Sequence, residues 1–365
     1  MILQNLHTYQ YRNIEDISIE CDESINCIIG KNGVGKTNLL DSIYFLAACK
    51  SNIITNDSLN VNSSKTAFLI QGNFIVKKKE YKIACSYDSI EKEKRIICND
   101  KKYARFSDHI GLIPIIFICP ADISLINGGG SERRKFIDTY ISQYDTEYLQ
   151  NLVAYHKILN QRNTILKQDK KIDYTYLEII DSQLCEYAEL IYAQRKAAIS
   201  ELEKITISYY QAISNTDECA LQYDSQRNQQ PFEQLLQKNF EKDSILGYTT
   251  AGVHRDDIIF LFNSGFLKHG GSQGQKKSFL LAIKFAQYQS LQEKKKQSPI
   301  ILLDDLFDKL DSERTKKVLD IVDRQEFGQI FITDTDKALL ETFFSQKKNS
   351  ATFWKFEQGS IKKSK

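Results

Sequence analysis

No two of the eight cysteines in this sequence have the CxxC spacing, so a zinc site has no support from the sequence. The first residues have neither the basic start nor the apolar run of a secretory signal. No apolar stretch approaches the ~20 residues that a membrane-spanning helix needs. We therefore expect reduced thiols, a cytoplasmic location and no membrane partner.

Neither sign of charge is in excess, because 49 Lys and Arg stand against 47 Asp and Glu, for a formal net charge of +2. This balance does not by itself indicate a nucleic-acid partner. No helix-turn-helix or zinc-finger pattern appears, so base-specific recognition of DNA is not expected. Any contact with DNA has to come from local clusters of cations. The candidate clusters are Lys77–Lys79, Lys101–Lys102 with Arg105, Arg133–Lys135 and Lys294–Lys296.

The spacing of apolar residues changes along the chain. Residues 1–100 alternate or run apolar over strand lengths, interrupted by one helix from Thr37 to Cys49. Asn99–Lys101 predicts a hairpin turn. Apolar residues then recur at steps near 3.5 between 149 and 202, with a charged break at Lys167–Asp173. This indicates two long antiparallel helices, either a short arm or ordinary amphipathic helices of a helical lobe.

Strands and helices alternate again from Tyr248 onward. Ile258–Phe262 has the length of a strand, and a helix is predicted over 276–292. Pro299–Leu303 and Ile330–Thr333 are short, fully apolar runs, which are typical of buried parallel strands. The pattern favours an α/β fold with a helical insertion.

One segment matches the phosphate-binding pattern G-x-x-x-x-G-K-[ST] at every fixed position: Gly30, Lys31, Asn32, Gly33, Val34, Gly35, Lys36 and Thr37. It follows a predicted strand and opens a predicted helix, where backbone N–H groups point at an anion. Lys36 is expected to neutralise the β- and γ-phosphates of ATP, and the Thr37 hydroxyl to bind Mg²⁺. Asn38, next in the helix, is included among the nucleotide-binding candidates.

A second apolar strand, over 300–303, ends in two carboxylates, Asp304 and Asp305. Paired with the phosphate loop, Asp304 is expected to hold Mg²⁺ and Asp305 to act as general base toward the attacking water. Most ATPases with this motif carry Glu at the second position. The shorter side chain of Asp305 predicts slow ATP hydrolysis.

The segment Gly271–Gln275 resembles the ABC signature motif, whose common form is Leu-Ser-Gly-Gly-Gln. Its candidate nucleotide contacts are Ser272, Gln273, Gly274 and Gln275, which in ABC proteins complete the site of a second subunit. Ser272 can equally be the N-cap of the following helix, and both roles can hold at once. Leu306–Asp311 resembles the D-loop that crosses the dimer interface, while Thr333–Asp336 has no His where the switch His normally stands.

Three longer stretches make the whole chain similar to the RecF family of bacterial recombination mediators. Tyr11–Asn13 resembles that family's first motif, in which Arg12 and Asn13 lie beside the nucleotide. The other two are Phe117–Ile123 with Leu125–Gly129 and Arg133–Asp138, and Asn239–Asp243 with Tyr248–Asp257. The sequence departs from the family at Val253, where Pro is usual, and at Ala121, where an acidic residue is common. The departure at Ala121 weakens the resemblance of the segment near Asp122 to a glutamine-loop-like switch.

The resemblance implies an ABC-type ATPase head of the P-loop NTPase class, with a helical second lobe carrying a short antiparallel arm. We expect lobe I over 1–117, the helical lobe over 118–246 and the rest of the ATPase lobe over 247–365. It further implies an ATP-dependent homodimer on single-stranded or gapped duplex DNA, with RecO and RecR as partners, recombinase loading and support of the SOS response. Weak ATP hydrolysis is expected to serve as a switch.

Among the cation clusters, Lys77–Lys79 and Lys101–Arg105 are preferred for DNA, because we expect them on an antiparallel sheet near the nucleotide. His254–Asp257 is expected to be structural or to couple the lobes. Three alternative functions remain: an SMC-like structural DNA clamp, an ABC transporter ATPase subunit, and a nucleotide-regulated scaffold that does not contact DNA. The long heptad segments typical of SMC proteins are missing from this sequence.

Overall fold

The computed structural model of the chain describes residues 1–167, 173–214, 218–263, 265–306, 311–323, 327–344, 351–357 and 360–363. The chain forms two compact units. Unit 1 comprises Met1–Asp122, Ala212–Ser214 and Lys284–Lys365, and unit 2 comprises Ile123–Gln211 and Asn215–Ile283. Both units are therefore assembled from segments that are distant in the sequence.

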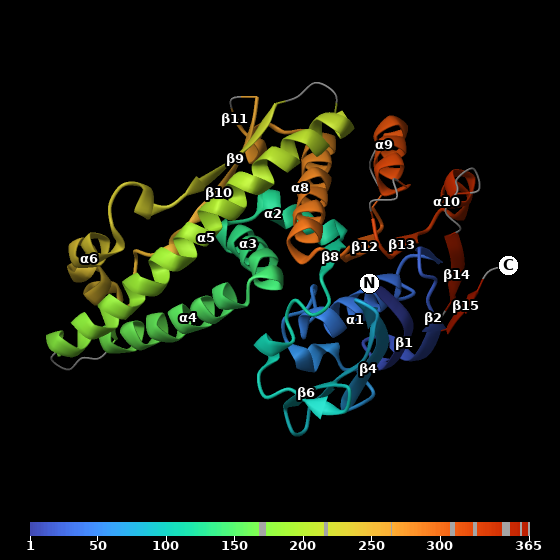
Figure 1. The fold of residues 1–365 in the computed structure, drawn as a ribbon, viewed down its shortest axis with the longest axis horizontal. Coiled ribbons are helices and arrows are strands. Elements are labelled where there is room, and N and C mark those ends of the chain that lie inside the picture. The colour runs from blue at the N-terminus through green and yellow to red at the C-terminus, as the bar shows by residue number, and fades with distance from the viewer. Residues whose placement is uncertain are drawn as a thin grey trace. The chain divides into compact units, whose positions relative to one another are not determined.

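Two six-stranded sheets form the frame of unit 1 (Figure 1). The first is antiparallel, with the order β2 (Ile14–Glu20), β1 (Ile2–Tyr11), β4 (Ala67–Val76), β5 (Lys79–Asp88), β6 (Glu93–Cys98) and β7 (Lys101–Lys102). The β6–β7 pair confirms the hairpin turn predicted at Asn99–Lys101, since Asn99 and Asp100 both have positive φ.

The second sheet has the order β15 (Ser360–Lys363), β14 (Ala351–Glu357), β3 (Ile25–Ile29), β13 (Ile330–Asp334), β12 (Ile300–Asp304) and β8 (Ile115–Ile118). All its neighbours run parallel except β15 against β14. Every residue of β3, β12 and β13 is buried, which confirms the prediction of buried parallel strands. The carboxyl ends of these strands meet at one edge of the sheet.

Helix α1 (Lys36–Ala48) packs on strands of both sheets of unit 1. Leu39, Leu40, Ile43 and Leu46 are fully buried in a core shared with both sheets. The predicted helix from Thr37 to Cys49 is confirmed to within one residue at each end. The other helices and 3₁₀ turns of the unit are η1 (Asp57–Asn60), η2 (Phe106–Asp108), α9 (Ser312–Asp323) and α10 (Lys337–Phe344).

Unit 2 is mainly helical. Its two long helices, α4 (Thr146–Leu166) and α5 (Tyr174–Ser214), lie side by side in Figure 1. Arg162 near the end of α4 pairs with Asp181 near the start of α5 at 2.6 Å, so the two helices are antiparallel as predicted. Around them are α2 (Ser124–Asn127), α3 (Gly130–Tyr144), α6 (Phe232–Leu246), α7 (Leu267–Gly270), η4 (Gln226–Asn228), η5 (Val253–Arg255) and a small sheet of β9 (Cys219–Asp224), β10 (Asp257–Phe262) and β11 (Gly265–Phe266).

Three of the described elements continue from one unit into the other along the chain. They are η3 (Pro120–Ile123), α8 (Gln273–Lys295) and α5, whose last three residues, Ala212–Ser214, belong to unit 1. Helix α8 includes the helix predicted over 276–292. All eight cysteines are free, and no His, Cys, Asp and Glu side chains gather as a metal site within the described residues. No described helix combines the length and hydropathy required to cross a bilayer.

Candidate nucleotide-binding site

The phosphate-binding segment forms a tight loop between β3 and α1. Gly33 and Gly35 have φ values of +81° and +117°, a region that L side chains rarely adopt. A Cβ atom at Gly35 would lie only 2.7 Å from Asn13 Oδ1. Glycine is therefore required at this position both by the backbone angle and by the close approach of Asn13. The loop ends where α1 begins, so the free N–H groups of the first helical turn face the loop.

Lys36 is the first residue of α1 and only 4% of it is exposed. Its Nζ donates to the carbonyl oxygens of Gly30 at 2.7 Å and Lys31 at 3.2 Å, and lies 3.9 Å from Asp305 Oδ1. Beside it is a pocket of about 250 Å³ lined by Asn32, Gly33, Gly35, Lys36, Thr37, Asn38 and Asp305. The ammonium is thus held inside the loop, at a pocket that an anion can enter.

Asp304 links the phosphate loop to the acidic strand. Thr37 Oγ1 donates to Asp304 Oδ2 at 2.7 Å, and Thr333 Oγ1 donates to Asp304 Oδ1 at 2.7 Å. Burial raises the pKa of Asp304; the two threonine hydrogen bonds and Lys36 oppose the shift, and the neighbouring Asp305 adds to it. The structure places a hydroxyl and a buried carboxylate together, which is a set of oxygen ligands suited to Mg²⁺.

Asp305 is the more accessible of the two carboxylates, with 32% of its side chain exposed. Its φ of +41° is unusual for a residue other than glycine and turns the chain sharply after β12. Its backbone N–H donates to Thr333 Oγ1 at 3.1 Å. Thr333 therefore fixes both acidic residues. In the sequence, Thr333 stands in an apolar strand before the position of the missing switch His, and nothing in that pattern indicates this role.

Arg12 and Asn13 follow β1 and contact the first turns of α1. Asn13 Nδ2 donates to Val34 O at 3.0 Å, and Asn38 Nδ2 donates to Asn13 Oδ1 at 2.6 Å. The Arg12 guanidinium bonds Asn38 Oδ1 at 2.8 Å and pairs with buried Asp41 at 2.8 Å. Its other partners are Ser51 and Asn60. These contacts hold the loop and α1 in place, and direct contact of Arg12 with a nucleotide stays a prediction.

The signature-like segment lies in unit 2, at the start of α8. Ser272 Oγ accepts from the Gln275 N–H at 3.2 Å, and Gln275 Oε1 accepts from the Ser272 N–H at 2.8 Å. This reciprocal pair is a capping box. Ser272 is therefore an N-cap. Its second predicted role, as a nucleotide contact, stays a prediction. Residues 307–310 of the D-loop-like segment lie outside the described residues.

Two of the three cations in the cluster Arg133–Lys135 bond to other residues of unit 2. Arg133 is buried and forms a two-point ion pair with Asp257, at 2.6 and 2.8 Å. Arg134 donates to the Asp256 carbonyl oxygen at 2.6 Å. Of the three, Lys135 alone is exposed. The structure thus assigns the arginines of this cluster to internal packing.

The position expected for Lys77–Lys79 was wrong. Strand pairing puts Leu3 of β1 opposite Phe74 of β4, next to the turn at Lys77–Lys78. Arg12, which contacts the loop-bearing helix, is nine residues farther along β1, or about 30 Å at ~3.3 Å per residue. The lysine turn is therefore at the end of the sheet remote from the phosphate loop, because the strands are long and the two features occupy opposite ends.

His254 is half-buried in a hydrogen-bond network of unit 2. Its Nε2 lies 3.0 Å from the Thr249 carbonyl oxygen, and its Nδ1 lies 2.6 Å from Tyr155 Oη. Because a carbonyl only accepts, Nε2 carries the proton and Tyr155 donates to Nδ1. Burial lowers the pKa of His254 to about 4. These are contacts of a neutral, structural histidine.

Comparison with known proteins adds the identity of the fold. Residues 25–103 match a family model described as "AAA domain, putative AbiEii toxin, Type IV TA system". The chain is similar over 100% of its length to a solved structure described as the "recombination mediator protein RecF-ATP in RecFOR pathway", with 28% identity, a TM-score of 0.90 and 98% of that chain covered. It also has the fold of an Smc head domain from Pyrococcus furiosus, at 14% identity and a TM-score of 0.59, with 100% of this chain and 96% of that chain covered.

Curated relatives named "DNA replication and repair protein RecF" match almost the whole chain. The protein from Parabacteroides distasonis is 39% identical, with 99% of each chain covered. The protein from Flavobacterium johnsoniae is 41% identical over 92% of this chain and 94% of its own. The chain is thus a member of the RecF family of DNA replication and repair proteins, with the fold of an ABC-type ATPase head.

Proposed function

We propose that this chain is an ATP-dependent DNA-binding protein of recombinational repair and replication that closes as an ATP-sandwiched dimer on DNA. The observation that carries the proposal is the 2.7 Å hydrogen bond from Thr37 to Asp304, next to the buried Lys36. Thr37 and Lys36 at the start of α1 line one pocket together with Asp305, and Asp304 is bonded to Thr37. This combination suits the phosphates of a nucleotide and a divalent ion.

ATP would lie with its phosphates against the loop of Gly30–Gly35. Lys36 offers charge to the β- and γ-phosphates, and the Asn13–Asn38 pair keeps the loop in shape. Thr37 and Asp304 would hold Mg²⁺, which neutralises phosphate charge when bound. Asp305, which lines the pocket, is the candidate general base. Its strained backbone and short side chain favour slow hydrolysis. ATP would therefore serve mainly as a switch between the open and closed states of the dimer.

The second half of the nucleotide site would come from a partner copy. Ser272–Gln275 lies at the N-terminus of α8, whose first N–H groups and positive dipole end favour an anion. A γ-phosphate bound to the loop of one subunit is expected to contact this helix start on the other. ATP then stabilises the dimer by binding the closed state better than the open one.

In the cell, such a dimer would act at single-strand gaps, where it helps load the recombinase with RecO and RecR and supports the SOS response. This step is supported by family membership and by the solved structure described as belonging to the RecFOR pathway. Phosphate contacts by Lys and Arg, without base-specific reading, fit a protein that recognises a DNA structure.

Sedimentation velocity with and without Mg-ATP, in the presence of a gapped duplex, tests the proposal. We expect a dimer that holds the duplex with ATP and a monomer without it. Added salt should weaken the DNA complex. Asp305→Asn keeps a side chain that tolerates positive φ and removes the base, so it should accumulate the dimer. A protein that binds ATP but stays monomeric and ignores DNA would overturn the proposed clamp while leaving the nucleotide site intact.

A further inference from the structure

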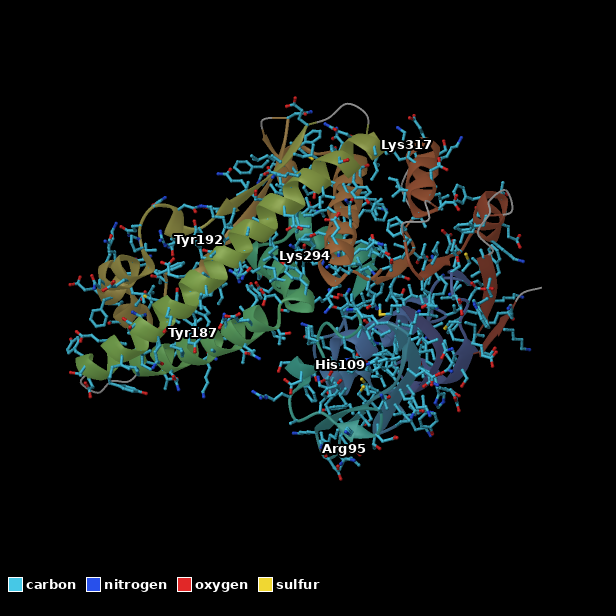
Figure 2. The ribbon with its side chains drawn as sticks, viewed as in Figure 1. Arg95, His109, Tyr187, Tyr192, Lys294 and Lys317 are labelled. Carbon is cyan, nitrogen blue, oxygen red and sulfur yellow. The ribbon has the colours of Figure 1, made fainter. Side chains whose placement is uncertain are left out.

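Two lysine segments that are more than 200 residues apart in the sequence come together in unit 1. Lys77 and Lys78 form the turn between β4 and β5, and Lys79 begins β5. Lys294 and Lys295 end α8, and Lys296 follows it. Lys294 projects near the end of this helix in Figure 2. The nearness of Lys77 contributes, after burial, to a lowered pKa of the Lys295 ammonium. Like charges so placed repel each other.

A continuous series of contacts explains why these segments meet. Tyr288 of α8 accepts from the Gly328 N–H at 2.6 Å. The side chain of the next residue, Gln329, bonds both the N–H and the carbonyl of Leu3, at 2.7 and 2.8 Å. Leu3 pairs with Phe74 of β4, three residues before Lys77. The convergence therefore follows from main-chain pairing and a buried glutamine, not from flexible surface side chains.

The backbone at both turns is in a conformation that lysine disfavours. Lys77 and Lys78 have φ of +48° and +65°, and Lys296 has φ of +50°. Val76 pairs with Lys79, so Lys77 and Lys78 form a two-residue hairpin of a kind that favours Asn-Gly. Lys296 follows the helix end, where Gly is favoured. Lysine at three such positions costs stability, and strain of this kind is often found at functional sites.

The surface around the lysines is not that of a protein-docking groove. Within the described residues, no exposed large hydrophobic side chain lies within ten sequence positions of either segment. Lys77, Lys78, Lys79, Lys295 and Lys296 form no ion pair with any described residue, and the six lysines outnumber the two flanking carboxylates, Glu80 and Glu293. Hydrated point charges without an apolar centre suit a row of phosphates better than a folded protein partner.

We infer that Lys77–Lys79 and Lys294–Lys296 form one site for the phosphate backbone of DNA, remote from the nucleotide pocket. We name it the far lysine site. It rests on the proposed function for the identity of the polyanion. It lies about 30 Å from Arg12 along β1, as the strand spacing requires. Neither lysine segment lines the nucleotide pocket, so the far lysine site gives the nucleotide-free monomer a weak, salt-sensitive contact with DNA. The ATP-closed dimer of the proposed function then strengthens this contact.

The triple variant Lys77→Asn, Lys78→Gly and Lys296→Gly tests the site. Each change removes a charge and installs a residue suited to positive φ, so the fold should be retained or stabilised. The matched control is Lys92→Gly, Lys238→Gln and Lys242→Gln, which removes equal charge from exposed lysines elsewhere. Lys92 also has positive φ, at +54°. Fluorescence anisotropy with a labelled gapped duplex, without nucleotide and at several salt concentrations, gives affinity and salt dependence.

We expect the triple variant to bind the duplex roughly tenfold more weakly at low salt. Its slope of log affinity against log salt should be shallower by about 2 to 3. The control variant should match the unchanged protein in both. Equal slopes for both variants would overturn the inference. So would a triple variant that keeps DNA binding but loses binding to poly-L-glutamate, since an acidic protein would then be the partner. Mg-ATP dimerisation of the triple variant, measured by sedimentation, should be normal, which separates this test from that of the proposed function.

Discussion

Thr37 and Asp304, 267 positions apart in the sequence, share a 2.7 Å hydrogen bond. It connects the first turn of α1 to the end of β12, although β13 separates β12 from the strand that precedes the loop. Thr333 on β13 bridges the gap by bonding the other oxygen of Asp304. Hydroxyl groups from the start of α1 and from β13 thus converge on one carboxylate at the end of β12.

Replacing Lys36 with alanine should greatly weaken nucleotide binding. The ammonium is buried against two carbonyl oxygens and is the only cation within the described lining of the pocket. A charged hydrogen bond of this kind contributes about 1.5–3 kcal/mol, so ATP affinity should fall by about 10- to 100-fold or more. Isothermal titration calorimetry measures it. Lys31→Ala, at an exposed loop position, is the control and should retain most of the affinity.

Asp304→Asn should raise the free energy of unfolding and, at the same time, reduce Mg²⁺-dependent ATP binding. Burial raises the pKa of Asp304, so its ionised form is disfavoured in the folded state and opposes folding as pH rises through that pKa. Without metal, the neutral Asn should therefore increase the free energy of unfolding at pH 7. The same variant should lose the Mg²⁺-dependent part of ATP affinity. Urea unfolding and calorimetry with and without Mg²⁺ measure the two effects, and a destabilised variant would contradict the first.

Acidification should weaken Mg²⁺-dependent ATP binding, because a protonated Asp304 is a poor ligand. Since burial raises the pKa of this group, the loss should begin at a higher pH than for an exposed aspartate. Titrations of Mg-ATP between pH 5 and 8 test the direction. An Asp304→Asn variant is the control and should show no such dependence.

Two substitutions at Ser272 should distinguish capping from phosphate contact. Ser272→Ala loses the cap of α8 and should cost about 1 kcal/mol of stability. Ser272→Asp keeps an N-cap side chain but adds a negative charge where a γ-phosphate is expected, so it should be stable yet fail to dimerise with ATP. Thermal unfolding and sedimentation velocity give the two readouts. An Asp variant that dimerises normally would place the phosphate elsewhere.

His254 should make the protein less stable in mild acid. Its pKa is about 4 when folded and near 6.5 when unfolded, so the unfolded state binds more protons below about pH 6.5. The penalty should reach about 2 kcal/mol at pH 5. Comparing unfolding at pH 7 and pH 5 in the unchanged protein and in His254→Gln measures it. His7→Gln, at a more exposed histidine, is the matched control for removal of one imidazole.

Local patterns were sufficient for the elements of the fold. The glycines and Lys36 of the loop, the apolar runs of β12 and β13, and the charged break between α4 and α5 each act within a few residues, so they can be recognised in sequence. The antiparallel arrangement of α4 and α5 follows because a short connection allows little else. Family motifs then indicated how these elements combine.

The partners of the polar side chains were decided only by the tertiary structure. Arg133 and Lys77 belong to similar basic runs, yet Arg133 is paired internally with Asp257 and Lys77 lies in a turn beside the end of α8. Strand order decides that Thr333 stands between Asp304 and the loop, and strand length decides that the lysine turn is far from the nucleotide pocket. A sequence specifies local conformation and burial through nearest neighbours. Contacts between charges that are distant in the sequence depend on how whole strands pair. For this chain, strand order and register in the folded sheets decided those contacts.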